Sequence, residues 1–269
     1  PCKSNPVDRS RIHLVTCIGT GYESRLLPYY LAHYQTLGVP AENFHIVVNA
    51  ATVPDDAERK ALDVLDRFHV KAEEIWREAY TSELMWQKRR DVQRRCVPAR
   101  HWVISADLDE FHEYPMALSE FLGECEANAV NCVDGVFIDR ISQTGELAEL
   151  PETASLDTCF PHEAMVQGQA VGYGRHHHAV GSIKVMAFDA ELLPKRGGHG
   201  FVQERGKARF LGGRSVSAFP GINTPFVRFR IPLRVHHYKW HAGLLATLRQ
   251  RVATPGVSAA GAEYANALF

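Results

Sequence analysis

The chain has 269 residues, of which 45% are hydrophobic and 23% are charged, as in an ordinary soluble globular protein. Thirty Lys plus Arg and 31 Asp plus Glu give a formal net charge of −1. This charge excludes attraction to nucleic acid or to an anionic membrane through the overall charge of the protein. No apolar run approaches the ~20 residues of a transmembrane helix and residues 1–11 form no signal-peptide core, so we expect a single-domain cytoplasmic protein.

The first half of the chain begins with alternating strand and helix patterns. The apolar run over residues 12–18 predicts a buried strand, and leucines and tyrosines at helical spacing predict a helix over 26–37. Gly38 is the expected stop of that helix. Residues 44–48 predict a second strand, and 52–68 a helix that opens on a sequence similar to a capping box, with Thr52 as its cap.

The same alternation continues to about residue 141. We expect a weak strand over 70–75, a helix over 81–96 and a third clear strand over 101–105. A helix over 118–129 and a strand over 135–141 follow. This order predicts an α/β fold in which helices flank a mostly parallel central sheet.

The second half is more irregular and richer in glycine. It carries two strand-like segments, residues 182–188 and 226–235, and a helical pattern over 244–252. We interpret the chain as one domain. Its half over 12–150 has regularly alternating strands and helices, its half over 151–252 has a more irregular pattern, and residues 253–269 form a loose tail. Six scattered cysteines show neither a C-x-x-C pair nor zinc-finger spacing, so we expect reduced thiols.

Three acids follow directly after the strand predicted over 101–105. They are Asp107, Asp109 and Glu110. In open α/β sheets ligands bind outside the carboxyl ends of strands, and residues i and i+2 of an extended segment point the same way. Asp107 and Asp109 would then converge on one ligand, and hard carboxylates suit Mg²⁺ or Mn²⁺ with a diphosphate. A solvated acidic loop is the alternative.

Basic side chains precede the acids, on the helix predicted over 81–96. Lys88 and Arg95 are seven residues apart and share one helix face. We expect most of the basic residues of this helix to form a solvated face, with one or two reaching a phosphate. Nucleic acid is not favoured as a partner, since aromatic residues are not interleaved with the basic ones.

Histidines gather at three places in the second half. His237, or its neighbour His236, lies between a strand and a helix and could complete an octahedral metal site, and Lys239 could neutralise a phosphate. A purely structural histidine is the equal alternative. His199 lies between glycines, which suits a close approach of the backbone to a ligand. We expect residues 176–178, three consecutive histidines, to form a surface loop, with a metal tract as the minority alternative.

Four stretches of the chain carry the pattern of a known family. They are residues 16–18 with 23 and 31–39, then 86–89, then 102–111, and finally 183–186 with 199 and 237–239. The third stretch, WVISADLDEF, is the most specific of the four. On these residues the chain resembles glycosyltransferases of the GT-A fold, in the family-2-like and family-92-like group with a D-x-D-E-F core.

The resemblance implies a nucleotide-diphosphate-sugar donor, a hydroxyl acceptor on a small molecule or glycan, and Mn²⁺ or Mg²⁺ as cofactor. Residues 12–150 would bind the donor and 151–252 would face the acceptor. Asp109 would hold the metal, with Asp107 and His237 beside it, and Asp107 would also face the ribose or the sugar. The implied nucleotide-sugar contacts are Thr16, Ile18, Glu23, Lys88, Asp107, Lys184, His199 and Lys239.

An inverting sugar transfer needs a carboxylate that deprotonates the acceptor hydroxyl, while the metal neutralises the leaving diphosphate. Asp139, Asp157 and Glu163 are the candidate general bases, and their spacing does not choose among them. An inverting glycosyltransferase is the leading hypothesis. A metal-dependent nucleotide-sugar hydrolase or pyrophosphorylase, and a non-catalytic domain that binds nucleotide or carbohydrate, are the alternatives.

Overall fold

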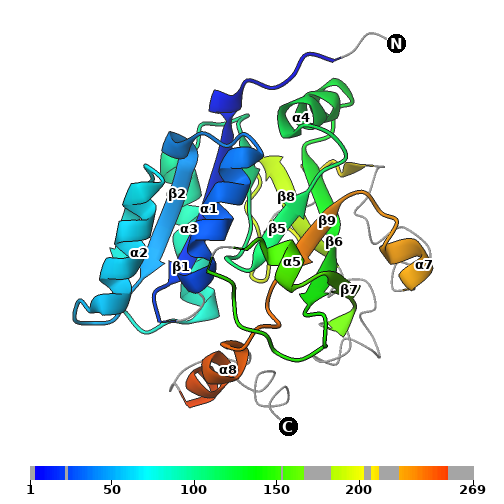
Figure 1. Cartoon of the computed structure of the whole chain (residues 1–269). Coiled ribbons are helices and arrows are strands. Elements are labelled where there is room, and N and C mark those ends of the chain that lie inside the picture. Colours follow the sequence, from blue (N-terminus) through cyan, green and yellow to red (C-terminus); the bar gives the residue numbers. More distant parts are fainter. Residues whose placement is uncertain are drawn as a thin grey trace.

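The computed structural model describes residues 4–21, 24–152, 154–166, 183–202, 207–211 and 224–253. In these residues nine strands form one mixed sheet with helices on both faces (Figure 1). The strands are β1 (Ile12–Gly19), β2 (Phe44–Asn49), β3 (Ala72–Trp76), β4 (Trp102–Ile104), β5 (Glu110–Glu113), β6 (Cys132–Ile141), β7 (His162–Ala164), β8 (Ile183–Asp189) and β9 (Arg234–His237). The helices are α1 (Leu27–Thr36), α2 (Asp56–Arg67), α3 (Ser82–Cys96), α4 (Leu118–Ala127), α5 (Leu156–Cys159), α7 (Pro225–Arg228) and α8 (Leu244–Ala253).

The strand order is β3-β2-β1-β4-β8-β6-β9-β5, and β7 pairs with the last residues of β6, on the edge opposite β9 and beyond the end of the pairing with β8. The prediction of a parallel sheet holds for β3, β2, β1 and β4, which pair in parallel as successive β-α-β units require. In the second half β6 and β9 are parallel, whereas β4–β8, β6–β8, β6–β7 and β5–β9 are antiparallel. β5 begins six residues after the end of β4, too soon for a parallel crossover, and it pairs with β9 instead.

Two apolar clusters, one on each face of the sheet, explain why the β1 sequence is continuously hydrophobic. Leu14 packs in the cluster that also contains α1, whereas its neighbour Val15 packs in the cluster that contains Trp86 of α3. Both side chains are at most 2% exposed. A strand covered on both faces has no polar side to show in its sequence, and this is the pattern from which β1 was predicted.

Most of the elements predicted in the first half are confirmed within a few residues. Helix α1 ends just before Gly38, whose φ of +103° is the left-handed conformation that favours glycine at a helix end. The five cysteines among the described residues are free thiols, as expected. None of the described helices has the length and apolar character needed to cross a membrane. The three histidines at 176–178 and the tail from 254 to 269 lie outside the described residues.

The strand predicted over residues 226–235 is wrong. Its first part is the short helix α7, with Pro225 in the first turn, and only Arg234–His237 are in a strand. Proline has a φ that suits the first turn of a helix, and Pro232 has no N–H to give to a sheet ladder. The buried Arg228 donates from its guanidinium to the Phe137 carbonyl at 2.7 Å, which holds α7 against β6.

The start of α2 also differs from the prediction. The cap is Asp55 rather than Thr52, and the Asp55 carboxylate accepts a hydrogen bond from the Glu58 N–H at 2.9 Å. We expect Asp55→Ala to lower the free energy of unfolding by about 1 kcal/mol, because an orphan N–H loses its acceptor. Thr52→Ala, three residues earlier and outside the helix, should change it by less than about 0.5 kcal/mol. Urea denaturation followed by circular dichroism measures both, and equal losses would contradict the assignment of the cap.

Candidate functional site

A tight turn follows β4 at the carboxyl end of the sheet. The Glu110 N–H donates to the Asp107 carbonyl at 3.0 Å, so that residues 107–110 reverse direction before β5 begins. The expectation that Asp107 and Asp109 point the same way from an extended segment is therefore wrong. Because they occupy the first and third positions of a turn, their carboxylates reach different partners.

Asp107 belongs to a cluster of two acids and two bases, which we call the charge cluster. Its carboxylate accepts from Arg89 at 2.5 Å and from Lys184 Nζ at 2.7 Å. Lys184 also contacts the Glu110 carboxylate at 2.5 Å, and the second oxygen of Glu110 accepts from the Asp107 N–H at 2.9 Å. The side chains of Arg89, Lys184 and Glu110 are at most 5% exposed, whereas that of Asp107 is 36% exposed. Asp107 is thus the member that faces outward.

Arg89 comes from α3 and was not singled out by the sequence. It also donates to the Val15 carbonyl at 3.1 Å and to Ser105 Oγ at 2.7 Å, and its guanidinium lies 4.2 Å from the centre of the Trp86 ring. Arg89 is thus an exception to the solvated face predicted for most of the basic residues of this helix. The available signal was its position four residues after Met85, on the helix face that turns to the sheet.

The electrostatics of the charge cluster follow from burial and its two cations. Burial raises the pKa of the Asp107 carboxyl, but Lys184 and Arg89 outweigh it and hold that pKa well below its usual range. Burial and the neighbouring Asp107 charge raise the pKa of Glu110 to about 7 in spite of Lys184. Burial lowers the pKa of Lys184, while the two acids raise it above its usual value. Asp107 therefore stays ionised with both oxygens already bound to cations.

Asp109 points to a second set of partners on β9 and β6. Its carboxylate lies 3.2 Å from His237 Nε2, and the other ring nitrogen of His237 lies 2.9 Å from the Asp139 carboxylate. Trp240 Nε1 donates to the same Asp139 oxygen at 2.8 Å. The Tyr238 N–H donates to the Asp109 carbonyl at 2.8 Å, which fixes the end of β9 to the turn.

This arrangement fits a divalent cation at Asp109 and His237. A histidine that binds a metal through one nitrogen usually donates its other N–H to a carboxylate, and the fully buried Asp139 is such a partner. Mg²⁺ and Mn²⁺ are commonly held by one or two protein ligands plus waters and phosphate oxygens. Burial lowers the pKa of His237, but Asp109 and Asp139 outweigh it and raise that pKa to about 10. Burial raises the pKa of Asp109, but the charge and hydrogen bond of His237 outweigh burial and lower that pKa to about 2.

Four other residues were predicted to contact the nucleotide-sugar donor, and they have different surroundings. Thr16 is fully buried and donates to the Ala106 carbonyl at 2.7 Å, and Ile18 is 1% exposed. Lys88 is paired with Glu74 on β3. Glu23 lies outside the described residues.

His199 and the glycine before it lie against the charge cluster. His199 Nδ1 lies 2.5 Å from the Ile183 carbonyl, and Gly198 has a φ of +70°. A Cβ on Gly198 would lie 2.6 Å from Lys184 Cε and 3.1 Å from Trp86. The backbone at Gly198 thus lies close to Lys184 and Trp86 of the protein itself, and the approach to a ligand stays a prediction.

The three candidate bases differ in their surroundings. Asp139 is wholly buried behind His237. Asp157 is 70% exposed, pairs with Arg140 at 3.1 Å and accepts a hydrogen bond from the Tyr238 hydroxyl at 2.5 Å. Glu163 on β7 pairs with Arg234 at 3.3 Å.

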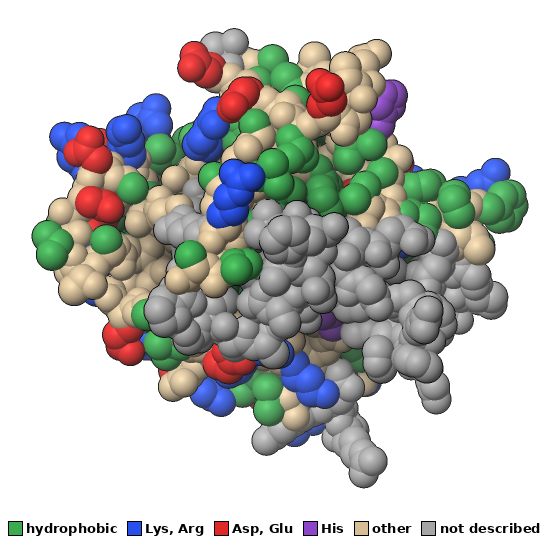
Figure 2. Space-filling view, turned by 90° about the horizontal axis from the view of Figure 1, so that it is seen from below, with side chains coloured by type: hydrophobic (Ala, Val, Ile, Leu, Met, Phe, Trp, Pro, Cys, Tyr) green, Lys and Arg blue, Asp and Glu red, His purple; other side chains and the backbone are tan. Residues whose placement is uncertain are grey.

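The carboxyl ends of β1 and β2 point to the lower side of Figure 1, where α8 also lies. Figure 2 shows this side, on which acidic and basic side chains of the described residues are interspersed rather than gathered by sign.

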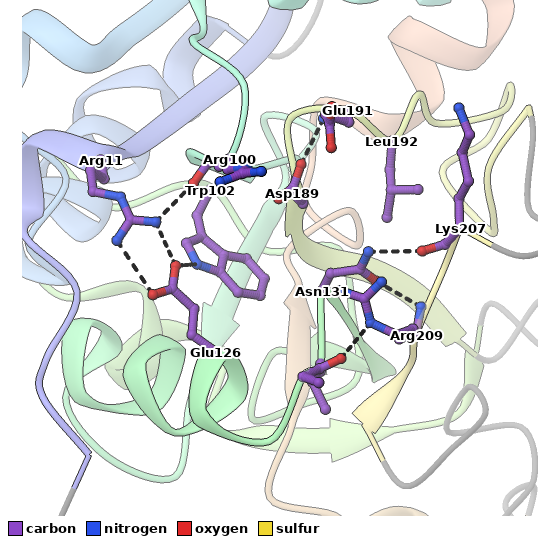
Figure 3. Close-up of a pocket in the computed structure, with 12 residues that line it drawn as sticks. Arg11, Arg100, Trp102, Glu126, Asn131, Asp189, Glu191, Leu192, Lys207 and Arg209 are labelled. Atoms are coloured by element: carbon purple, nitrogen blue, oxygen red, sulfur yellow. Dashed lines mark hydrogen bonds and ion pairs between the residues drawn. The ribbon is translucent and has the colours of Figure 1, made fainter.

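A hollow of about 680 Å³ lies at the opposite end of the sheet, where β4 begins (Figure 3). There Arg11 and Trp102 both bind Glu126, and the Arg209 guanidinium donates to the Ala129 carbonyl.

No protein-family model matches the chain, and no curated protein matches it. Solved structures that resemble it include the mannosyltransferase PcManGT from Pyrobaculum calidifontis in complex with GDP-Man and Mn²⁺, at 13% identity and a TM-score of 0.42. S. aureus TarS 1–349 matches at 8% identity and a TM-score of 0.34. The alignments cover 94% and 96% of this chain, but only 64% of the first protein and 69% of the second. Both TM-scores lie below 0.5.

Proposed function

We propose that the chain is a metal-dependent glycosyltransferase of the GT-A type. It would move a sugar from a nucleotide-diphosphate sugar to a hydroxyl of a small molecule or glycan, with inversion at the sugar. The observation that carries this proposal is the Asp109–His237 pair at the carboxyl end of the sheet, with the buried Asp139 behind it. Ligands of open α/β sheets bind at this end.

A divalent cation bound there supplies positive charge that neutralises the diphosphate as it leaves. Asp109 and His237 are its proposed ligands. Asp139 and Trp240 orient the His237 ring, because Asp139 accepts its Nδ1–H and Trp240 holds Asp139 in place. The other nitrogen, Nε2, lies 3.2 Å from Asp109 and would lose its proton to solvent when it binds the metal. Lys239, two residues after His237, is the proposed contact to a phosphate.

Asp107 has a different proposed role from Asp109. Arg89 and Lys184 hold both of its oxygens in one orientation, and its side chain is still partly exposed. A fixed, ionised carboxylate accepts hydrogen bonds from the hydroxyls of a ribose or a sugar. We therefore assign Asp107 mainly to the donor, and count it as a metal neighbour rather than a principal ligand.

The nucleotide has a natural place along β1. The pairing of β1 with β4 ends at Leu14, whereas β1 itself continues to Gly19. The part of β1 that contains Thr16 and Ile18 therefore extends beyond the end of β4, toward the turn over residues 107–110. The side chains of Thr16 and Ile18 are buried and both residues pair with β2, so the nucleotide would lie against the edge of β1 that extends beyond β4 rather than against these two side chains. Lys88, Lys184 and His199 complete the proposed donor pocket, together with Glu23.

For the general base we favour Asp157 over Glu163. Each acid pairs with one arginine, but the side chain of Asp157 is 70% exposed and that of Glu163 only 31%. Asp157 also accepts a hydrogen bond from Tyr238, which directly follows His237. Asp139 is best described as a positioning residue, since its carboxylate is fully buried and occupied by His237 and Trp240. An acceptor hydroxyl could not reach it without displacing them.

The proposal is tested by the melting temperature in the presence of UDP, GDP or dTDP, each with and without Mn²⁺. We expect at least one of them to raise the melting temperature with Mn²⁺ and to have little effect with EDTA, because a ligand that binds only the native state stabilises it. If none of them does so, the proposal is wrong. Donor breakdown without any acceptor would favour the hydrolase, and binding without turnover would favour a binding domain.

A further inference from the structure

A second group of metal-ligating side chains lies away from the candidate active site. His45 is on β2, Glu73 is on the neighbouring strand β3, and Cys96 is the last residue of α3. One ligand atom from each lies within 4.8 Å of the other two, and His45 Nδ1 is 2.7 Å from the Glu73 carboxylate. Among the described residues, these three form the group of His, Cys, Asp or Glu side chains whose ligand atoms all lie within 4.8 Å of one another.

We propose that His45, Glu73 and Cys96 bind one zinc ion. An imidazole nitrogen, a carboxylate oxygen and a thiolate sulfur are all common zinc ligands, and the sulfur favours zinc over the Mg²⁺ or Mn²⁺ proposed at Asp109. Tetrahedral bonds of about 2.0–2.3 Å would place the three ligand atoms roughly 3.3–3.6 Å apart. The His45 and Glu73 atoms, now 2.7 Å apart, would separate slightly, and one ligand atom of Cys96 already lies within 4.8 Å of both residues. The fourth position would take water, and the thiol proton of Cys96 would leave to solvent.

The burial of the group suits both retention and entry of an ion. His45 is 6% exposed, Cys96 is partly exposed and Glu73 is exposed, so one side is fixed and the other open to solvent. The ligands come from three elements, and a bound ion would connect the end of α3 to two neighbouring strands. Their separation in the sequence explains why no zinc-finger spacing is visible.

A chain of histidines supports His45 as a ligand through Nδ1. The other nitrogen of His45, Nε2, is 3.0 Å from His13 Nδ1, and His13 Nε2 is 2.9 Å from His101 Nδ1. A neutral imidazole has one N–H and one lone pair. With Nδ1 of His45 on zinc, its Nε2–H donates to His13, and His13 in turn donates to His101. Every nitrogen between these rings is then satisfied, as expected around a metal-bound histidine.

Cobalt(II) tests the site, because only a thiolate ligand gives it a strong sulfur-to-metal absorption band in the near ultraviolet. The full chain carrying Asp109→Asn, to weaken the other proposed site, is titrated with Co²⁺ and then with Zn²⁺. We expect the band to appear at one equivalent and to vanish when zinc displaces cobalt. Cys96→Ser should abolish it, whereas the matched Cys159→Ser, on α5, should retain it.

Two further variants test the other contacts. Glu73→Gln changes an exposed side chain, so the fold should persist, and the affinity for Zn²⁺ should fall at least about tenfold. His13→Leu should lower the affinity for Zn²⁺ roughly 10- to 100-fold, while the cobalt–thiolate absorption band remains. Absence of the band in the parent chain, or its persistence in Cys96→Ser, would overturn the proposal. Because the band needs sulfur, this result is independent of metal binding at Asp109.

Discussion

Asp109→Asn is expected to remove the Mn²⁺ dependence of nucleotide binding and to lower the rate of sugar transfer by roughly 10²–10³-fold or more. The amide keeps the size of the side chain but loses the negative charge that faces His237 at 3.2 Å. The fold should be retained, because the Tyr238 N–H bonds to the Asp109 carbonyl of the backbone and not to its side chain. Initial rates with donor and acceptor, and melting temperatures with a nucleotide diphosphate and Mn²⁺, measure the effect.

The matched control for this variant is Asp63→Asn. Asp63 is an exposed aspartate on α2, outside the candidate site, and its replacement removes the same charge from the molecule. It should leave both the rate and the melting shift unchanged. If Asp109→Asn behaves like Asp63→Asn, the metal does not bind at Asp109 and the proposed function loses its main support.

At pH 9, where Glu110 of the parent is ionised, Lys184→Met is expected to lower the free energy of unfolding by about 3–5 kcal/mol, because the buried carboxylate must either stay charged without a partner or take up a proton. Lys184 bridges Asp107 at 2.7 Å and Glu110 at 2.5 Å, and the Glu110 side chain is only 2% exposed. Arg89 would still pair with Asp107, so Glu110 is the acid that loses its cation. Urea denaturation of the parent and the variant measures the change.

The double variant Lys184→Met with Glu110→Gln should recover part of that loss, since the unpaired charge is then removed as well. Lys195→Met is the matched control, because Lys195 is exposed and its replacement should cost less than about 0.5 kcal/mol. A Lys184→Met variant as stable as this control would mean that Lys184 is not needed to neutralise buried charge. Equal losses in the single and double variants would mean that Glu110 is not the affected partner.

Local periodicity in the sequence is enough to predict several elements of the first half. The buried strands β1 and β2, the helix α1 with its stop at Gly38, and α3 follow from the apolar spacing of neighbouring residues. The sequence also located Asp107 and Asp109 directly after a strand. Side-chain directions within the turn were not predictable, because the extended geometry assumed for residues 107–109 is replaced by a turn whose hydrogen bond needs no special residue type.

Which side chains of the candidate site contact one another depends on the tertiary structure. His237 reaches Asp139, 98 residues earlier, because β9 pairs with β6 in one register, and it reaches Asp109 because β9 also pairs with β5. Arg89 lies inside because the face of α3 that carries it packs on the sheet. Such contacts depend on strand register and helix packing, which balance burial over the whole core, and a local pattern of residues does not encode them.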